Sequence, residues 1–285
     1  RRRRLLRPRN SKGSAKSSSS SSSNSSSSSC TTPHSGHHAL DIGRDPSALV
    51  RLLCTLDIDT VIHAAGPPGD AGCRDAPSDA LRVHVEVPYM LAQGWLHLGG
   101  RRLVYLSTLL DPAASTYASY KRLGELWISQ REGGRILRLG SVYGGPARND
   151  GVVSRFIDAV LQGRDVNIHG DGTQRIALVH MRDVVEAVLR AVDSRSPQTP
   201  RLVQVVDGWV SVVELLDMIE MLAGRRAARV YQPEAGPLAR RRYMLDSALP
   251  RHLSTDPAHL RVDLRSGLTC AIREAQARAP GVTRS

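Results

Sequence analysis

The sequence is short of cysteine, of aromatic residues and of long apolar runs, and each shortage excludes a class of protein. The four cysteines among 285 residues, Cys30, Cys54, Cys73 and Cys270, lack the spacing of a zinc site or of a disulfide framework. No apolar stretch approaches the ~20 residues that a membrane-spanning helix needs, and the N-terminus lacks the apolar segment of a secretory signal. We therefore expect no metal site, no membrane partner and a reducing, cytoplasmic location.

Acidic residues are absent from the first 16 positions, which hold eight Lys or Arg residues. The other 31 basic residues face 27 acidic ones, so most of the formal net charge of +12 comes from the N-terminal tail. Aromatic residues make up only 4% of the chain and do not interleave with the basic residues, as a surface that binds single-stranded nucleic acid would require. We expect no specific nucleic-acid partner; a protein that contacts nucleic acid through this tail is one alternative.

Residues 1–37 contain almost nothing that could be buried. The run from Ser17 to Ser29 is serine except for Asn24, and such a segment cannot offset the conformational entropy that folding removes. We therefore predict that residues 1–37 form a disordered basic and serine-rich tail.

From residue 38 onward, short β-branched runs alternate with amphipathic segments. The predicted strands are 60–66, 102–107 and 135–139, and the predicted helices are 46–53, 78–97 and 117–133. Asp45 followed by Pro46 is typical of a helix N-cap with proline at the first helical position, whereas we expect residues 67–77 to form a loop and Pro88 to kink or delay its helix. The alternation predicts an α/β fold, a Rossmann-like doubly wound parallel sheet with helices on both faces.

Beyond residue 150 the pattern predicts a smaller α+β part. Its predicted elements are helices at 152–161, 183–192, 212–223 and 266–277, strands at 176–180, 202–206 and 228–231, and a hairpin-like region at 165–172. We predict that residues 38–150 and 176–200 form an incomplete dinucleotide-binding domain. Residues 151–175 and 201–285 are assigned to a substrate-binding part.

Glycine or hydroxyl residues come directly after three of the predicted strands, at Gly66, Ser107-Thr108 and Gly140-Ser141. Ligands of open α/β sheets bind beyond the carboxyl ends of the strands. The sequence therefore predicts a ligand site where these three strand ends meet.

Tyr117 and Lys121 lie four residues apart in a predicted helix, so they share one of its faces. A phenol normally ionises near pH ~10, and a nearby ammonium favours the phenolate. Tyr117 is thus a candidate proton donor or acceptor, and the hydroxyl of Thr108 or Ser107 could hold a substrate oxygen against it. Such a set suits chemistry at a carbonyl or a secondary alcohol, although an ordinary surface helix can also contain this pair.

With these residues in view, the chain resembles the extended short-chain dehydrogenases/reductases, and among them the NAD-dependent epimerase/dehydratase family of nucleotide-sugar epimerases and ketoreductases. The resemblance covers about residues 41–278. The segments that carry it are Ile58–Gly66, Leu106–Thr108, the Tyr117/Lys121 pair, Leu137–Gly144, Gly151–Ile157, Gly170–Gln174 and Val179–Val185.

The resemblance implies a role for each matching residue. Tyr117 would exchange a proton with a sugar hydroxyl or ketone, Lys121 would lower the phenol pKa and bind the nicotinamide ribose, and Thr108 or Ser107 would bind the reacting oxygen. The residues that would line an NAD or NADP cofactor are Asp41, Ile42, Ala64, Ala65, Gly66, Lys121, Gly140 and Ser141. Arg155 and Arg175 would bind the diphosphate of a nucleoside-diphosphate sugar, because a guanidinium matches phosphate geometry.

The sequence departs from the family in its N-terminal part. The family opens with a strand, a glycine-rich phosphate-binding turn and a helix, and no such glycine pattern occurs before residue 41. Loss of this first βαβ unit would leave the strand around Val61 and Ile62 unpaired on one side. We interpret the difference as a truncated or mis-started chain rather than a remodelled N-terminus. His84 also stands where the family usually has asparagine.

These observations lead to one preferred function and one alternative. We expect an NAD(P)-dependent nucleotide-sugar epimerase or 4-ketoreductase, acting on a deoxyhexose nucleotide, with a homodimer as the candidate assembly. The alternative is a non-catalytic relative that keeps the fold as a binding or scaffold module.

Overall fold

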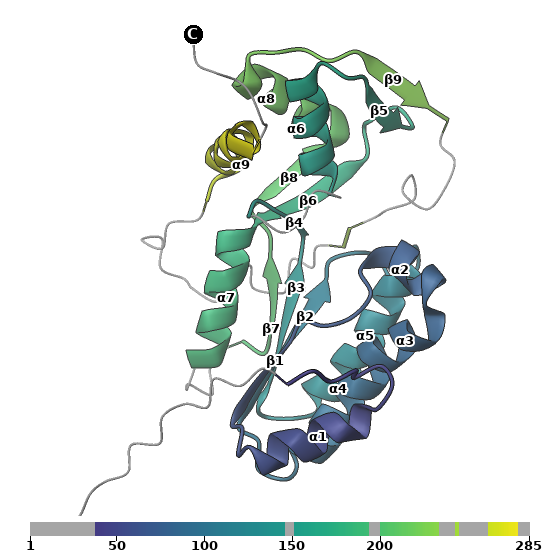
Figure 1. Cartoon of the computed structure of the whole chain (residues 1–285), viewed down its shortest axis with the longest axis vertical. Coiled ribbons are helices and arrows are strands. Elements are labelled where there is room, and N and C mark those ends of the chain that lie inside the picture. Colours follow the sequence, from purple (N-terminus) through teal and green to yellow (C-terminus); the bar gives the residue numbers. More distant parts are fainter. Residues whose placement is uncertain (1–37, 146–150, 194–199, 234–242, 245–261, 279–285) are drawn as a thin grey trace, which may run out of the picture. The chain divides into compact units, whose positions relative to one another are not determined.

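The structure of the chain, a computed structural model, describes residues 38–145, 151–193, 200–233, 243–244 and 262–278. Within the unit formed by residues 40–285, strands and helices alternate along most of the sequence (Figure 1). The tail at 1–37, for which we predicted disorder, lies outside the described residues. In the ranges that are described, no helix combines the length and the apolar character needed to cross a membrane.

The larger sheet contains four parallel strands in the order β1-β2-β3-β7. They are β1 (Thr60–His63), β2 (Arg102–Thr108), β3 (Gly134–Leu139) and β7 (Leu202–Val205). The middle of β2 is buried on both faces, since Leu103, Val104 and Tyr105 are all inaccessible to solvent. This sheet confirms the predicted Rossmann-like parallel α/β fold.

Helices cover both faces of this sheet (Figure 1). They are α1 (Pro46–Thr55), α4 (Val87–Met90) and α5 (Thr116–Ser129) on one face, and α7 (Met181–Asp193) on the other. Leu53 of α1 and Ile128 of α5 belong to the same apolar cluster as Leu103. Ala187 of α7 packs in a second cluster with the next residue of β2, Val104. Successive side chains of a strand point to opposite faces, so β2 is the layer that separates the two clusters.

Residues 69–95 form a helical run that the sequence predicted only in part. The run contains α2 (Gly69–Asp75), α3 (Pro77–Leu81), the π turns η1 (Arg82–Glu86) and η2 (Leu91–Trp95), and α4 between them. The prediction of a loop at 67–77 was wrong, because α2 is too short to show an apolar period. Pro88 neither ends nor delays the helical run. Another residue at this position would donate its backbone N–H to His84 O, but proline has no N–H. Tyr105 Oη donates to that oxygen instead, at 3.1 Å.

One edge of the larger sheet is open. Among the described residues, β1 pairs only with β2. Ile62 in β1 is 47% exposed, although apolar strand edges are normally paired or covered. The unpaired edge lies where we expected the absent glycine-rich unit to leave a gap.

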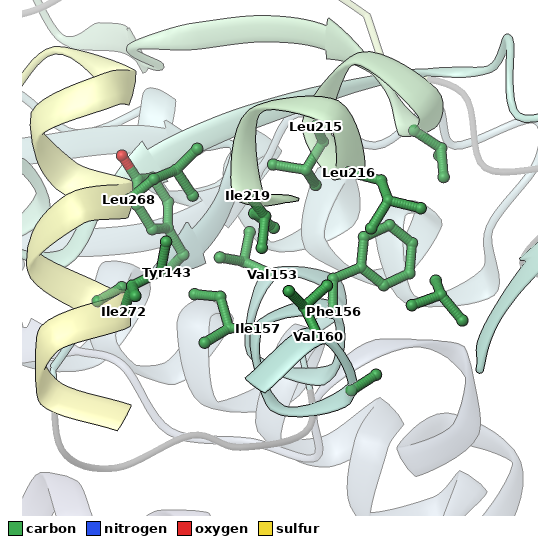
Figure 2. Packing of buried hydrophobic residues seen from close by; sticks show 14 of the residues in the cluster. Tyr143, Val153, Phe156, Ile157, Val160, Leu215, Leu216, Ile219, Leu268 and Ile272 are labelled. Carbon is green, nitrogen blue, oxygen red and sulfur yellow. The ribbon is translucent and has the colours of Figure 1, made fainter. Parts of the chain in front are cut away.

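Two smaller sheets and three helices enclose a second apolar core. One sheet holds β4 (Ser141–Tyr143), β6 (Arg175–His180) and β8 (Gly208–Ser211), and the other pairs β5 (Val166–His169) with β9 (Arg229–Gln232). The helices are α6 (Val152–Gln162), α8 (Val212–Ala223) and α9 (Leu264–Arg278). Figure 2 shows Phe156 and Val160 of α6 beside Leu216 and Ile219 of α8, and all four belong to one buried cluster.

Strand pairing differs from the sequence prediction in three places. The hairpin at 165–172 was wrong, because β5 pairs in parallel with the distant β9. β7, placed above with the substrate-binding part, is the fourth strand of the larger sheet, and β6, placed with the dinucleotide-binding part, pairs with β4 and β8. An apolar run predicts a strand but does not say which sheet it joins, since pairing depends on contacts that are distant in sequence.

The second core gives a direct test of the packing. Leu216 is fully buried, whereas Met221 on the same helix is 57% exposed. Leu216→Ala should therefore lower the free energy of unfolding by about 2–5 kcal/mol, and Met221→Ala by less than about 0.5 kcal/mol. Urea denaturation followed by circular dichroism measures both, and equal effects would contradict the packing of α8.

Candidate active site

Helix α5 turns its candidate residues toward the larger sheet. The helix begins at the N-cap Ser115, whose Oγ accepts a hydrogen bond at 3.1 Å from the backbone three residues on. Tyr117 and Lys121 then follow one turn apart, and Gly124 continues the same side. A Cβ at Gly124 would lie 2.5 Å from a backbone oxygen of η1, so glycine lets α5 approach the neighbouring helical run closely.

The ammonium of Lys121 is buried beside the end of β2. Nζ donates to Leu106 O at 2.9 Å, and it lies 4.8 Å from the ring centre of Tyr105 and 5.7 Å from that of Tyr117. Burial lowers the pKa of Lys121 to about 8, and the nearby Glu125 opposes the shift. Lys121 is therefore a cation at neutral pH, close to the Tyr117 ring and on the same side of α5.

The two hydroxyls at the end of β2 have different partners. Ser107 Oγ donates to the carboxylate of Glu125. Thr108 Oγ1 accepts from Leu110 N at 3.2 Å, a contact that leaves its hydroxyl hydrogen available as a donor. The hydroxyl hydrogen of Ser107 is therefore already used in the protein, whereas that of Thr108 is not.

Glu125 fixes the end of β2 to α5 and β3. Its carboxylate accepts from Arg122 Nη1 at 2.5 Å and from Arg138 Nη2 at 2.7 Å, and Glu125 itself is buried. Arg122 Nη1 also donates to Thr108 O at 3.0 Å. A buried carboxylate needs such partners because an unpaired buried charge is costly.

His84 lies between the end of β1 and Tyr117. Its Nε2 is 3.0 Å from Pro67 O, and because a carbonyl only accepts, Nε2 carries the hydrogen. The His84 and Tyr117 rings are perpendicular, with centres 5.2 Å apart. Burial, helped by the Lys121 charge, lowers the pKa of His84 to about 4, so the ring is neutral at pH 7. Nδ1 is buried and makes no hydrogen bond to the part of the chain described here.

The glycine and alanine residues predicted to line a dinucleotide follow β1 directly. Ala64, Ala65 and Gly66 are exposed, and Gly66 has a φ of +128°. A Cβ at Gly66 would lie 2.2 Å from His84 Cε1, so only glycine fits there. The absence of bulky side chains leaves this strand end open to close approach by a ligand.

The other predicted cofactor residues are placed differently. Gly140, at the end of β3, is buried against Ala177, and Ser141 Oγ lies 2.6 Å from Tyr243 Oη. Asp41 Oδ1 closes a turn by accepting from two following backbone amides, at 3.1 Å and 3.2 Å. Ile42 packs against the apolar cluster of α1.

These residues fit the nicotinamide end of NAD better than its diphosphate end. Ala64–Gly66 leave the end of β1 open to the nicotinamide ring, and the buried Lys121 would lie beside the nicotinamide ribose. Within the described ranges, no further strand pairs with the open edge of β1, where a glycine-rich turn would hold the diphosphate.

The two arginines expected to bind a diphosphate lie outside the contacts around Lys121. Arg155 is exposed in the first turn of α6. Arg175 begins β6, and its guanidinium donates to Trp209 O. A separate shallow hollow is lined by Gly170, Asp171, Tyr231, Gln232 and Pro233.

Three residues at this site were missed in the sequence. Asp70 bonds the start of α5 from 47 residues away, and Tyr243 reaches Ser141 across 102 residues; no local pattern predicts either contact. Glu125 could have been found, because it lies four residues after Lys121 on the same side of the helix.

The fold and the strand-end residues define a Rossmann-like α/β protein of the extended short-chain dehydrogenase/reductase type. The model of the NAD dependent epimerase/dehydratase family matches residues 12–205, more than half of the chain. The chain therefore belongs to this family.

Individual relatives share modest sequence identity with this chain. A UDP-glucuronate 4-epimerase of Thermodesulfobacterium geofontis is 24% identical over 206 residues, covering 65% of this chain and 63% of the relative. A dTDP-4-dehydro-6-deoxy-D-allose reductase of a Streptomyces species is 30% identical over 134 residues, covering 45% of this chain and 40% of the relative. The chain thus spans less than two thirds of either protein.

A solved structure supports the fold. The crystal structure of UDP-glucuronic acid 4-epimerase from Bacillus cereus, in complex with UDP-glucuronic acid and NAD, superposes with a TM-score of 0.64. The match covers 80% of this chain and 78% of that protein, at 20% sequence identity.

The burial of Lys121 predicts a pH-dependent stability. Between pH 8 and 10.5 the folded protein loses the Lys121 proton while the unfolded chain keeps it. Because the unfolded state then binds more protons, the free energy of unfolding of the wild type should rise with pH relative to that of Lys121→Met. The rise across this window should be on the order of 3 kcal/mol.

Urea denaturation at several pH values measures this difference. Arg74→Met, at an exposed position of α2, serves as the control and should show no such pH dependence. A constant difference between wild type and Lys121→Met from pH 7 to 10.5 would show that the ammonium is not buried.

Proposed function

We propose that this chain is an NAD-dependent nucleotide-sugar epimerase or 4-ketoreductase in which the Tyr117 phenol transfers the proton. The observation that carries the proposal is the buried Lys121 ammonium, 5.7 Å from the centre of the Tyr117 ring. A buried cation is costly to accommodate, and beside a phenol it favours the phenolate and so makes proton exchange feasible near neutral pH.

In this mechanism, Tyr117 Oη accepts the proton of a sugar hydroxyl when the carbon is oxidised and returns it when the ketone is reduced. Lys121 stabilises the phenolate through its charge, and Leu106 O, which binds Nζ, keeps that charge in place. When bound, NAD supplies the acceptor and donor of hydride. Proton transfer by a positioned group of this kind contributes roughly 10²–10⁴-fold to a rate.

Thr108 is the better candidate of the two hydroxyls for holding the reacting oxygen. Ser107 Oγ already donates its hydrogen to Glu125, whereas Thr108 retains a hydrogen to donate. The bond from Arg122 to Thr108 O holds this strand end against α5. We therefore assign the oxygen contact to Thr108 and a supporting role to Ser107.

The proposed cofactor contacts follow the strand ends. Ala64, Ala65 and Gly66 would line the nicotinamide, and Lys121 would bind its ribose. Gly140 and Ser141 would close the site at the end of β3, and Asp41 and Ile42 would lie toward the adenosine. We propose NAD rather than NADP, because the family is NAD-dependent and the Bacillus cereus epimerase was crystallised with NAD.

The proposed substrate is a nucleoside-diphosphate sugar, bound by the smaller part of the chain. Arg155 and Arg175 are exposed and suit a diphosphate. The two curated relatives described above act on a UDP-hexuronic acid and on a dTDP-deoxyhexose, as their names state. Epimerisation and 4-keto reduction share the same proton transfer, so the site suits both, and a deoxyhexose nucleotide is our preferred substrate.

A second candidate function is a non-catalytic scaffold. The observation that favours it is the open edge of β1, where the described residues provide nothing to hold a diphosphate. In that case the fold would bind the nucleotide sugar without binding NAD tightly.

Turnover by the full chain tests the enzyme. If the chain is an epimerase, a 4-epimer should appear in proton NMR spectra after incubation with NAD and UDP-glucuronic acid or UDP-glucose. If it is a reductase, the absorbance of NADH should fall on adding a dTDP-4-keto-6-deoxyhexose. Tyr117→Phe should lower kcat by about 10²-fold or more, because the phenyl ring carries no proton to transfer.

Tyr120→Phe is the matched control and should behave as the wild type, since Tyr120 is next to Lys121 in α5 and adjacent helix positions face different directions. Calorimetry should show unchanged nucleotide-sugar binding in both variants. Full activity of Tyr117→Phe would refute the proposed mechanism. Binding of the sugar nucleotide with neither turnover nor NAD binding would favour the scaffold.

We also propose that two copies associate through α4 and α5. Leu123, Leu126 and Trp127 are spaced along one side of α5, and the two leucines are 43% and 58% exposed. Trp127 meets Tyr89 of α4, with ring centres 4.9 Å apart, and Tyr89 is 45% exposed. Exposed apolar side chains grouped on two helices are typical of an interface, and a second copy would bury the same group in a closed pair.

Light scattering after gel filtration tests this assembly. The wild type should have twice the chain mass of 31.0 kDa, and Leu126→Arg should shift it toward the monomer, because burying an unpaired guanidinium is costly. Val185→Arg on α7, where Val185 is 50% exposed, should stay dimeric. A monomeric wild type at micromolar concentration would contradict the proposal.

A further inference from the structure

We propose that Asp70 is a positioning residue for Tyr117. Asp70 Oδ1 accepts hydrogen bonds from Tyr117 N at 3.0 Å and from Ser115 Oγ at 2.9 Å. Asp70 lies in α2, so this carboxylate joins the first turn of α5 to a different helix. The inference rests on the proposed role of Tyr117, but the contact itself can be tested without turnover.

Tyr117 N depends on this bond because the helix offers it no acceptor. The first four N–H groups of a helix lack intrahelical partners, and Tyr117 is the second residue of α5. Ser115 Oγ satisfies Ala118 N, and Asp70 satisfies Tyr117 N. The carboxylate also lies at the positive end of the α5 dipole, where a negative charge is favourable. Asp70 and Ser115 together thus fix the turn from which the phenol projects.

Asp70 also connects Tyr117 to the strand end proposed for the nicotinamide. Pro67 and Pro68, which have restricted backbones, lead from Gly66 into α2. Pro67 O accepts from His84 Nε2 at 3.0 Å, and the His84 ring meets the Tyr117 ring at 5.2 Å. The segment Gly66–Asp70 therefore holds Tyr117 twice, at its backbone through Asp70 and at its ring through His84.

Substitutions of Asp70 can distinguish whether Tyr117 N and Ser115 Oγ need only an acceptor oxygen or also the negative charge of the carboxylate. Asp70→Asn keeps an oxygen that can accept both bonds, whereas Asp70→Ala removes it. Asp75→Ala is the matched control, because Asp75 is an exposed residue of the same helix.

Amide hydrogen exchange of the ¹⁵N-labelled chain, measured by NMR, tests the contact. Tyr117 N–H should exchange about fivefold faster or more in Asp70→Ala than in the wild type, as expected for the loss of one hydrogen bond. Its exchange should change little in Asp70→Asn and in Asp75→Ala. Unchanged exchange of Tyr117 N–H in Asp70→Ala would overturn the proposal.

Kinetics then test whether the contact positions the phenol. Asp70→Ala should lower kcat about tenfold, with KM for the nucleotide sugar changed little, and Asp70→Asn should restore most of kcat. If Asp70 has only a structural role, Asp70→Ala should lower the folded fraction and leave kcat per folded molecule unchanged. That result would overturn the proposal that Asp70 positions Tyr117. If Asp70→Ala does not fold, Asp70→Glu, which displaces the carboxylate by one methylene, should show the same faster exchange and lower kcat.

The two proposals fail in different ways. A wild type without turnover would remove the proposed function, and the exchange experiment would still decide whether Asp70 holds the Tyr117 backbone. Turnover that survives Tyr117→Phe would show that a different group transfers the proton, and Asp70 would then have no positioning role in catalysis.

Discussion

The candidate site depends on the docking of one turn of α5 against the end of β2. Lys121 donates to Leu106 O, and Arg122, paired with Glu125, donates to Thr108 O. Each contact places a charged group in a buried or half-buried position, where it is stable only while its partner stays within hydrogen-bonding distance. A shift of α5 along the strand would break these contacts together. The position of the phenol one turn earlier is therefore set by electrostatic constraints and by apolar packing.

The open edge of β1 separates two requirements of an NAD-dependent enzyme. The groups proposed for proton transfer come from α5 and from the ends of β1 and β2, all of which pack against one another in the described residues. The glycine-rich turn that would hold a diphosphate has no counterpart beside β1 within that part of the structure. Proton transfer and tight cofactor binding would thus depend on different parts of this chain. For this reason, both the enzymatic function and the scaffold function should be tested.

Local signals in the sequence were enough to predict many of the elements but not their long-range contacts. The N-cap of α1 was predicted from Asp45 and Pro46, and Asp45 Oδ1 does accept from Ala48 N at 3.0 Å. The parallel sheet was predicted from short β-branched runs. In contrast, the pairing of β5 with β9 and the sheet to which β7 belongs depend on partners far along the chain, for which a local pattern carries no information.

The same limit applies to the site. The spacing of Tyr117 and Lys121 was visible in the sequence, because helix geometry makes positions four apart neighbours. The choice between Ser107 and Thr108 required the structure, since it depends on the carboxylate of Glu125. The bond from Asp70 could not be predicted either, because α2 has no periodic pattern.

A titration of lysine side chains by NMR tests the central claim most directly. The chain contains only three lysines, Lys12, Lys16 and Lys121, so the ¹³Cε signals of labelled lysine can be resolved, and Lys121→Arg identifies that of Lys121. The account predicts that the Lys121 signal titrates with a pKa of about 8, because burial disfavours the charged form of the side chain. A Lys121 signal that titrates near 10.5, the ordinary lysine value, would place the ammonium in water and contradict the account.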